Sequence, residues 1–259
     1  MAFGSQKTSC GLIALTLIAT WPLHGVEGKD VWPEGELQYR VLHKHWRGSC
    51  EGTLALNAGG IIYREASEKK PASKLHTWAW QYQDIQQLEL SEKAILIKTY
   101  RDRVWRLGAD EEITFLFQAG QDPKLAYDRL KNRLDQRFVA ALAADDVKAL
   151  WTVPVKLRGL VNGSNGVLVV GEDRITYKSE DPGKSRTWRY RDIDNLSTSG
   201  PFRLTMVTFE HGSLHYGDRK EFDFQLKEPL SEDRYNELWQ RLNKEKGLRI
   251  LDLYKEDKQ

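Results

Sequence analysis

The pattern of hydrophobic and polar positions along this chain occurs twice, over residues 41–134 and again over residues 155–243. In both copies a Trp, a Tyr and an Asp alternate just ahead of an Ile, beginning at Trp80 and at Trp188. A repeat of about 110 residues is long enough to bury a core of its own. The pattern therefore predicts two domains of the same fold.

Within the first copy, short alternating segments predict strands. They cover residues 37–45, 53–57, 61–64, 78–82, 85–90, 94–100 and 103–107, followed by an apolar face at Ile113, Phe115 and Phe117. The intervening Ala58-Gly59-Gly60 is typical of a hairpin turn. The second copy repeats this plan and has the matching apolar positions Phe222, Phe224 and Leu226.

Each copy ends in a predicted helix. Asp122 and Pro123 are a helix cap and a first-turn residue, and apolar residues follow at helical spacing: Tyr127, Leu130, Leu134 and Phe138. We expect this helix to continue through Ala144. In the second copy, residues 229–233 open a helix whose apolar stripe is Tyr235, Leu238, Trp239 and Leu242.

The first 28 residues have a different composition. Lys7 is the only charge before Glu27, and the apolar run over residues 11–21 is closed by Pro22 and followed by small residues. This pattern is typical of an export signal, and the run is shorter than the ~20 residues of a membrane-spanning helix. We therefore expect a periplasmic or extracellular protein, with an uncleaved N-terminal membrane anchor as the alternative.

These observations give a domain plan. We expect a signal peptide over residues 1–28, a first domain over 36–144, a stiff connector over 145–154 and a second domain over 155–259. Six or seven strands closed by one C-terminal amphipathic helix resembles the pleckstrin-homology-like fold, and the chain is similar to a tandem of bacterial PH-like (GRAM/PH-type) domains. The resemblance implies a mainly β fold (α+β) of two PH-like barrels or sandwiches in tandem, each with one C-terminal helix.

The resemblance also implies a binding role, because members of that superfold bind phosphoinositides, peptides or other proteins. Lipid-binding members use a basic loop between the first two strands. The equivalent loops here, residues 45–52 and 159–166, carry one arginine, Arg47, and no basic residue, respectively. This composition disfavours binding of lipid headgroups.

Charge argues against nucleic acid as a partner. The 39 basic and 37 acidic residues are well mixed and give a formal net charge of +2. With this mixing, the sequence shows no strongly basic stripe of the kind that binds nucleic acid. The sequence also lacks Gly-x-Ser-x-Gly, His-Glu-x-x-His and phosphate-cradling motifs. We therefore do not expect an enzyme, although a hydrolase with carboxylates between the two repeats stays open.

The repeated Trp, Tyr and Asp positions have two interpretations. On a strand they share one face, so they form a candidate ligand platform: Trp80, Tyr82, Asp84, Trp188, Tyr190 and Asp192. Alternatively, each Trp packs in the core and each Asp fixes the following turn. We favour packing, because rings of this size usually belong to cores.

Histidines are the candidate metal ligands. His43 and His45 share one strand face, but a site needs three or four ligands, and the other candidates are His76, His211 and His215. The second copy has no such histidine pair. We therefore expect surface histidines, no metal and no cofactor. Cys50 is interpreted as a small, partly buried residue ahead of a strand, with a reactive or dimer-forming thiol as the alternative.

The sequence thus predicts a non-catalytic binding module of the cell envelope. We expect its partner to be a protein or peptide, held at an exposed strand edge or along a groove between helix and strand. Contact with a membrane surface is the alternative, and the oligomeric state is left open.

Overall fold

The structure is a computed structural model of the 259-residue chain. It describes residues 36–45, 48–67, 71, 74–102, 110–159, 163–211 and 219–245. The predicted export signal over residues 1–28 and the predicted strand over 103–107 lie outside these residues.

In the described part of the first half, seven strands follow the predicted chain order, and the additional strand predicted over 103–107 is not among the described residues. The seven strands are β1 (Leu37–His45), β2 (Gly48–Leu56), β3 (Gly60–Glu65), β4 (Thr77–Gln81), β5 (Ile85–Ser91), β6 (Ala94–Asp102) and β7 (Asp110–Phe117). A 3-10 turn, η2 (Tyr82–Asp84), joins β4 to β5, and the helix α1 (Pro123–Leu130) follows β7. Asp122 caps this helix by accepting a hydrogen bond from the Lys124 amide at 2.9 Å, as predicted.

The second half repeats these elements. Its strands are β9 (Ala149–Arg158), β10 (Ser164–Gly171), β11 (Arg174–Ser179), β12 (Arg186–Arg189), β13 (Ile193–Ser197), β14 (Arg203–Thr208) and β15 (Lys220–Leu226). The 3-10 turn η3 (Tyr190–Asp192) joins β12 to β13, and the helix α2 (Glu232–Glu245) ends the described chain. One further strand, β8 (Phe138–Ala141), lies between the halves.

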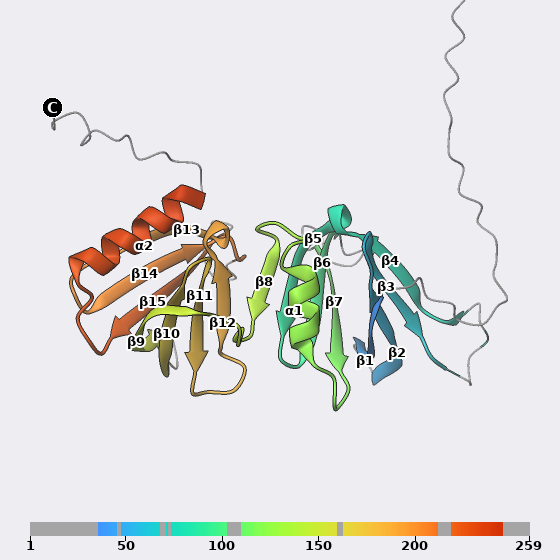
Figure 1. The fold of residues 1–259 in the computed structure, drawn as a ribbon. Coiled ribbons are helices and arrows are strands. Elements are labelled where there is room, and N and C mark those ends of the chain that lie inside the picture. The colour runs from blue at the N-terminus through green and yellow to red at the C-terminus, as the bar shows by residue number, and fades with distance from the viewer. Residues whose placement is uncertain are drawn as a thin grey trace, which may run out of the picture. The chain divides into compact units, whose positions relative to one another are not determined.

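The strand order is the same in both halves. It runs β5-β6-β7-β1-β2-β3-β4 in the first half and β13-β14-β15-β9-β10-β11-β12 in the second (Figure 1). The hydrophobic side chains form two clusters, one around Leu54 and Phe115 and the other around Leu168 and Phe224. The sequence repeat therefore corresponds to a repeat of topology and of cores.

The expectation of two PH-like barrels or sandwiches in tandem is wrong. All fifteen strands belong to one sheet, in which β8 connects the halves. It pairs in parallel with β5, where Leu88 lies opposite Phe138, and antiparallel with β12, where Thr187 lies opposite Ala140. Among the described residues neither half closes on itself, because β5 and β12 pair with β8 while β4 and β13 end the strand order.

The predicted length of the first helix is also wrong. Instead of continuing through Ala144, α1 ends at Leu130, and Phe138 begins β8. The segment over 145–154 is likewise only partly a connector, because β9 already starts at Ala149. Hydrogen-bond pairing with β5 and β12 outweighs the helical preference of this alanine-rich stretch.

Polar contacts hold the junction between the halves. Arg189 donates hydrogen bonds to the carbonyl oxygens of Leu134 at 3.1 Å and Asp135 at 2.6 Å, just beyond α1. The same guanidinium pairs with Asp192 at 2.6 Å. Because Arg189 and Asp192 are both buried, this pair fixes the second half against the chain that follows α1.

Candidate metal centre

The core of the first half ends in polar side chains at one end of its sheet. Four neighbouring strands alternate so that every second residue faces inward. Toward this end the inward-facing positions read Tyr39, Val41, His43 and His45 on β1; Leu54, Gly52 and Cys50 on β2; Ile61, Tyr63 and Glu65 on β3; and Trp80, Trp78 and His76 on and before β4. At this end of β1, β2 and β3, and just before β4, the inward-facing residues are His, Cys or Glu instead of apolar residues.

Antiparallel pairing brings these ends together. His43 lies directly opposite Cys50 in the β1–β2 ladder, and Gly52 lies opposite Glu65 in the β2–β3 ladder. The Glu65 amide donates a hydrogen bond to the His76 carbonyl at 2.9 Å, which carries the β3–β4 pairing to the same level. Side chains separated by up to 33 positions in the sequence (43 to 76) thus share one site.

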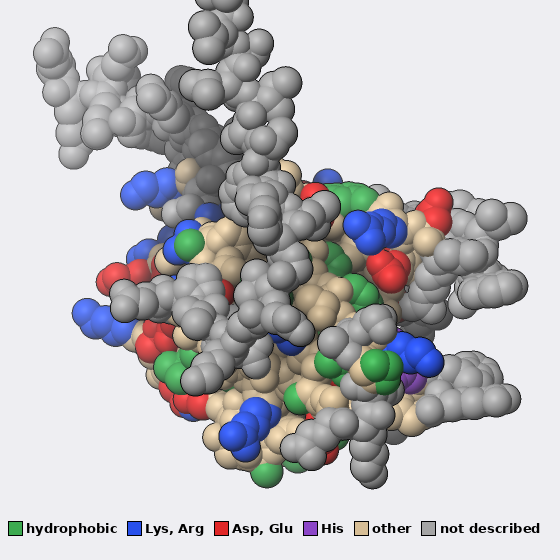
Figure 2. All heavy atoms as spheres, turned by 90° about the vertical axis from the view of Figure 1, so that its right-hand side faces the viewer, with side chains coloured by type: hydrophobic (Ala, Val, Ile, Leu, Met, Phe, Trp, Pro, Cys, Tyr) green, Lys and Arg blue, Asp and Glu red, His purple; other side chains and the backbone are tan. Residues whose placement is uncertain are grey.

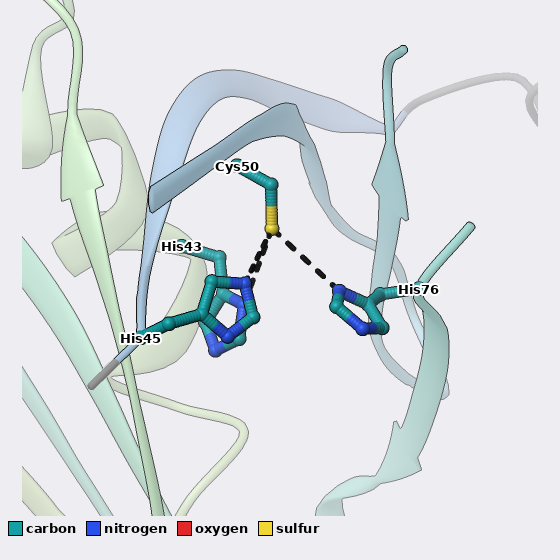
Figure 3. Close-up of side chains that lie close together, drawn as sticks. All are labelled: His43, His45, Cys50 and His76. Carbon is teal, nitrogen blue, oxygen red and sulfur yellow. Dashed lines mark hydrogen bonds between the residues drawn. The ribbon is translucent and has the colours of Figure 1, made fainter. Parts of the chain in front are cut away.

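Three imidazoles surround one sulfur atom (Figure 3). The Cys50 Sγ lies 2.7 Å from His45 Nε2, 3.7 Å from His43 Nδ1 and 3.6 Å from His76 Nδ1. One ligand atom from each of the four residues lies within 4.8 Å of the others. Imidazole nitrogen and thiolate sulfur are the donors that zinc and related transition metals prefer.

These distances can be compared with those of a tetrahedral zinc ion. Bonds of about 2.3 Å to sulfur and 2.05 Å to nitrogen place sulfur and nitrogen about 3.6 Å apart. The separations from Cys50 to His43 and His76, 3.7 and 3.6 Å, match this value. The separation to His45, 2.7 Å, is shorter than this value and needs to lengthen by about 0.9 Å. His45 is exposed, so its side chain has room to rotate.

Burial differs among the four residues. His43 is only 7% exposed, Cys50 and His76 are half-buried, and His45 is exposed. Desolvation lowers the pKa of His43 to about 4, and the neighbouring His45 and His76 act in the same direction. At neutral pH His43 is therefore uncharged, which is the form that binds a metal.

Aromatic rings line the site. Trp78 stacks on His76 with a centroid distance of 5.2 Å and an interplanar angle of 8°, and it meets His43 edge-on at 4.7 Å. Tyr63 donates a hydrogen bond from its hydroxyl to the Cys50 carbonyl at 3.5 Å. Burial raises the pKa of Tyr63, so its hydroxyl stays a donor. These contacts restrict His43, His76 and Cys50 to the orientations seen here.

A buried carboxylate completes the group. The Glu65 side chain is 1% exposed, and its Oε2 accepts a hydrogen bond from the His76 amide at 2.9 Å. The same oxygen lies 3.1 Å from His76 Nδ1. Glutamate is almost never buried to this degree without a partner of opposite charge or a metal.

The second half has the same strands without the cluster. From the strand registers, Val155 and Gly166 correspond to Val41 and Gly52. The positions of His43, Cys50, Glu65 and His76 are accordingly taken by Leu157, Ser164, Ser179 and Lys184. Ser164 bonds the Tyr177 hydroxyl at 2.8 Å inside the core. The fold therefore does not require imidazoles, a thiol or a carboxylate at this place.

The structure corrects several expectations for these residues. The expectation of surface histidines is wrong for His43, which is buried, although His45 is exposed. A histidine side chain reaches the surface in Figure 2, which views the molecule from the side of β1–β4. Cys50 is half-buried, as expected, and His43 and His45 lie beside it together with His76, which is distant in the sequence. His211 lies at the Gln87 side chain, outside the cluster, and His215 lies outside the described residues.

The candidate ligand platform is distributed differently from the expected strand face. In each half the strand ends before the Tyr, so Tyr82, Asp84, Tyr190 and Asp192 lie in the 3-10 turns η2 and η3. Trp80 is in the first core beside Phe115, and Trp188 donates to the buried Glu210 at 2.7 Å. The Tyr82 and Tyr190 hydroxyls bond the carbonyls of Asn57 at 2.9 Å and Gly171 at 2.6 Å.

One signal in the sequence indicates the cluster. Near the ends of β1, β2 and β3, and just before β4, an inward-facing position is His43, Cys50, Glu65 or His76, although the predicted strands at 53–57 and 61–64 did not include Cys50 and Glu65. Strand pairing then places all four at the same end of a meander. Taken one at a time, the histidines and the cysteine do not reveal this juxtaposition, and Glu65 was not among the expected ligands.

No helix among the described residues is both long enough and apolar enough to span a bilayer.

Comparisons with known proteins identify no family. No family model matches the sequence, and no curated protein matches it. Among solved structures, the chain is similar to one described as the Spt16D–Pob3N heterodimer, at 13% identity and a TM-score of 0.29. The match covers 74% of this chain and 97% of that chain. A TM-score this low supports no argument about fold or function.

Proposed function

We propose that this protein is a non-catalytic metal-binding module, in which His43, His45, Cys50 and His76 bind one transition-metal ion such as Zn²⁺. The observation that carries the proposal is the convergence of four ligand atoms within 4.8 Å of one another. Two of the three sulfur–nitrogen separations already match tetrahedral coordination. One thiolate and three imidazoles favour zinc, cobalt and copper over calcium or magnesium, which prefer oxygen ligands.

The internal repeat supports a functional origin of the cluster. Leu157 and Ser164 fill the places of His43 and Cys50 in a half with the same strand order. Burying an imidazole and a carboxylate costs free energy unless they are paired or bind a ligand. The second half is built on the same strand order without these groups, so the strand order itself does not require them.

Metal binding ties together the ends of β1 and β2 and the residue before β4. In the sheet, β4 is bonded to β3 and lies at the end of the strand order. An ion held by His76 on one side and by His43 and Cys50 on the other links this edge strand to the β1–β2 hairpin. The expected effect is greater stability of the first half.

The experiment measures binding stoichiometry with the full chain. The metal-free protein is titrated with Zn²⁺ and with Co²⁺ under reducing conditions, and bound metal is quantified after gel filtration. We expect one ion per chain and, for Co²⁺, a sulfur-to-metal charge-transfer band from Cys50. Cys50→Ser, which copies Ser164 of the second half, removes that band and lowers the affinity. His211→Gln is the matched control because it removes a histidine outside the cluster. Absence of stoichiometric binding by the unaltered chain refutes the proposal.

Binding of a protein or peptide is a second candidate. β4 and β13 end the strand order, and each is bonded to one neighbouring strand within the described chain. Such strands offer backbone groups to an added strand. Crosslinking of the full chain in envelope extract tests this function. Recovery of no partner at either edge strand counts against it.

A further inference from the structure

The Glu65 carboxylate lies beside the metal-binding nitrogen of His76. Glu65 is the last residue of β3 and faces the same side of the sheet as Tyr63, toward the cluster. Its Oε2 is 3.1 Å from His76 Nδ1. That nitrogen is also the His76 atom that faces the Cys50 sulfur, at 3.6 Å (Figure 3).

When a metal binds His76 Nδ1, this nitrogen can no longer donate a hydrogen bond to Glu65. In the metal-free protein, the 3.1 Å separation allows an Nδ1–H of His76 to donate to Glu65. A metal at Nδ1 takes the lone pair and excludes that proton. The Glu65 oxygen then faces the ion instead of a hydrogen.

The separation allows the same ion to contact both atoms. With metal–nitrogen and metal–oxygen bonds of about 2.05 and 2.1 Å, a 3.1 Å separation corresponds to an angle of about 97° at the metal. This angle lies between those of octahedral and tetrahedral centres. The Glu65 carboxylate is therefore within reach of an ion on His76 Nδ1, and to bind it the carboxylate moves toward the four ligand atoms that already lie within 4.8 Å of one another.

We propose that Glu65 is the fifth ligand of the ion, which gives a site of three nitrogens, one sulfur and one oxygen. This inference rests on the proposed function. A carboxylate is a hard, anionic ligand that suits divalent ions and is a poor ligand for Cu⁺, which prefers thiolate and imidazole. Glu65 thus makes the site selective for divalent ions over Cu⁺.

Glu65→Gln tests the role of the charge, since the amide keeps the size and leaves an oxygen to accept from the His76 amide. Glu51→Gln is the matched control. It removes the same charge one residue from Cys50, on an exposed side chain that points to the opposite face of β2. We expect Glu65→Gln to raise the Zn²⁺ dissociation constant at least tenfold and to leave Cu⁺ affinity within about twofold, with no change in Glu51→Gln.

The Co²⁺ spectrum separates a ligand from a carboxylate that only orients His76. Five-coordinate Co²⁺ absorbs more weakly in the visible region than tetrahedral Co²⁺. If Glu65 is a ligand, Glu65→Gln strengthens these bands. An unchanged spectrum, or equal losses of Zn²⁺ and Cu⁺ affinity, overturns the inference.

X-ray absorption at the zinc edge of the unaltered protein provides a test that does not depend on folding of the variant. One sulfur and four nitrogen or oxygen neighbours support the inference, and one sulfur and three such neighbours overturn it. In both cases the ion is bound, so the proposed function stands. Only absence of Zn²⁺ binding by the unaltered chain removes both.

Discussion

Replacing His43 by leucine separates the metal site from the fold. His43 is 7% exposed and lies among Trp78, Tyr63 and Phe115, with ring centroids at 4.7, 5.8 and 5.5 Å. The corresponding residue of the second half is Leu157, so the backbone at this position accepts leucine. A swap of similar volume in such surroundings changes stability by less than about 1.5 kcal/mol. The metal-free variant is therefore expected to fold.

The effect of zinc is large by comparison. A ligand at one hundred times its dissociation constant stabilises the folded state by about 2.7 kcal/mol. For a domain of this size, each kcal/mol raises the melting temperature by about 2–4 °C, which gives a rise of about 5–11 °C. If loss of His43 weakens binding about 100-fold, the same zinc concentration contributes only about 0.4 kcal/mol, or about 1–2 °C.

The assay is thermal unfolding of His43→Leu and of the unaltered protein, each with zinc and with a chelator. We expect similar melting temperatures in chelator and a much larger zinc-induced rise in the unaltered protein. An equal rise in both refutes the reasoning, because it places the stabilising ion elsewhere. If His43→Leu is much less stable than the unaltered protein in chelator, position 43 does not accept leucine in the way that Leu157 indicates.

Two other predictions concern charge. Because the pKa of His43 is lowered, the unfolded chain binds more protons than the folded chain between about pH 4 and 6.5, and the stability of the metal-free protein falls as pH falls through this window. Denaturant unfolding at several pH values is expected to show a smaller change of unfolding free energy with pH in His43→Leu. An equal change in both proteins contradicts the assignment. Arg189→Leu leaves the buried Asp192 unpaired and removes the donor to the carbonyls of Leu134 and Asp135, so we expect a loss of about 3–5 kcal/mol in chemical denaturation. Recovery of part of that loss by Asp192→Asn in the same chain supports the mechanism, and a loss below about 1 kcal/mol contradicts it.

Most strands followed from the sequence because one face of each is buried. Alternation located β1 at Leu37–His45 and β5 from Ile85, and Pro123 located the start of α1. The strand β8 did not follow, because all four of its residues are buried and it has no alternation. A short apolar run that is rich in alanine cannot be distinguished from a buried helix by periodicity. Only pairing with β5 and β12 decides its conformation, and that pairing is not local in sequence.

The sequence revealed the separate residues of the candidate metal site but not that they lie together. His43 and His45 were recognised as a pair on one strand face, and His76 was counted among the other histidines. Cys50 precedes its strand core at a position that the strand registers align with Ser164. The cluster requires the register of four strands, which depends on the hairpins and on the β3–β4 bonds of Glu65 and His76.

Comparison of the two halves shows that burying the polar side chains of the cluster costs free energy. At the same end of the core, the second half places Leu157 and a hydrogen-bonded Ser164, which need no ligand. The first half buries His43 and the Glu65 carboxylate there, and the low pKa of His43 reflects the cost of a charge at that position. Under the proposed function, a bound divalent ion offsets this cost by replacing protons and hydrogen bonds with metal–ligand bonds. Replacing His43 by leucine and Cys50 by serine, the residues at these positions of the second half, should therefore leave a metal-free fold that is at least as stable and no longer responds to zinc.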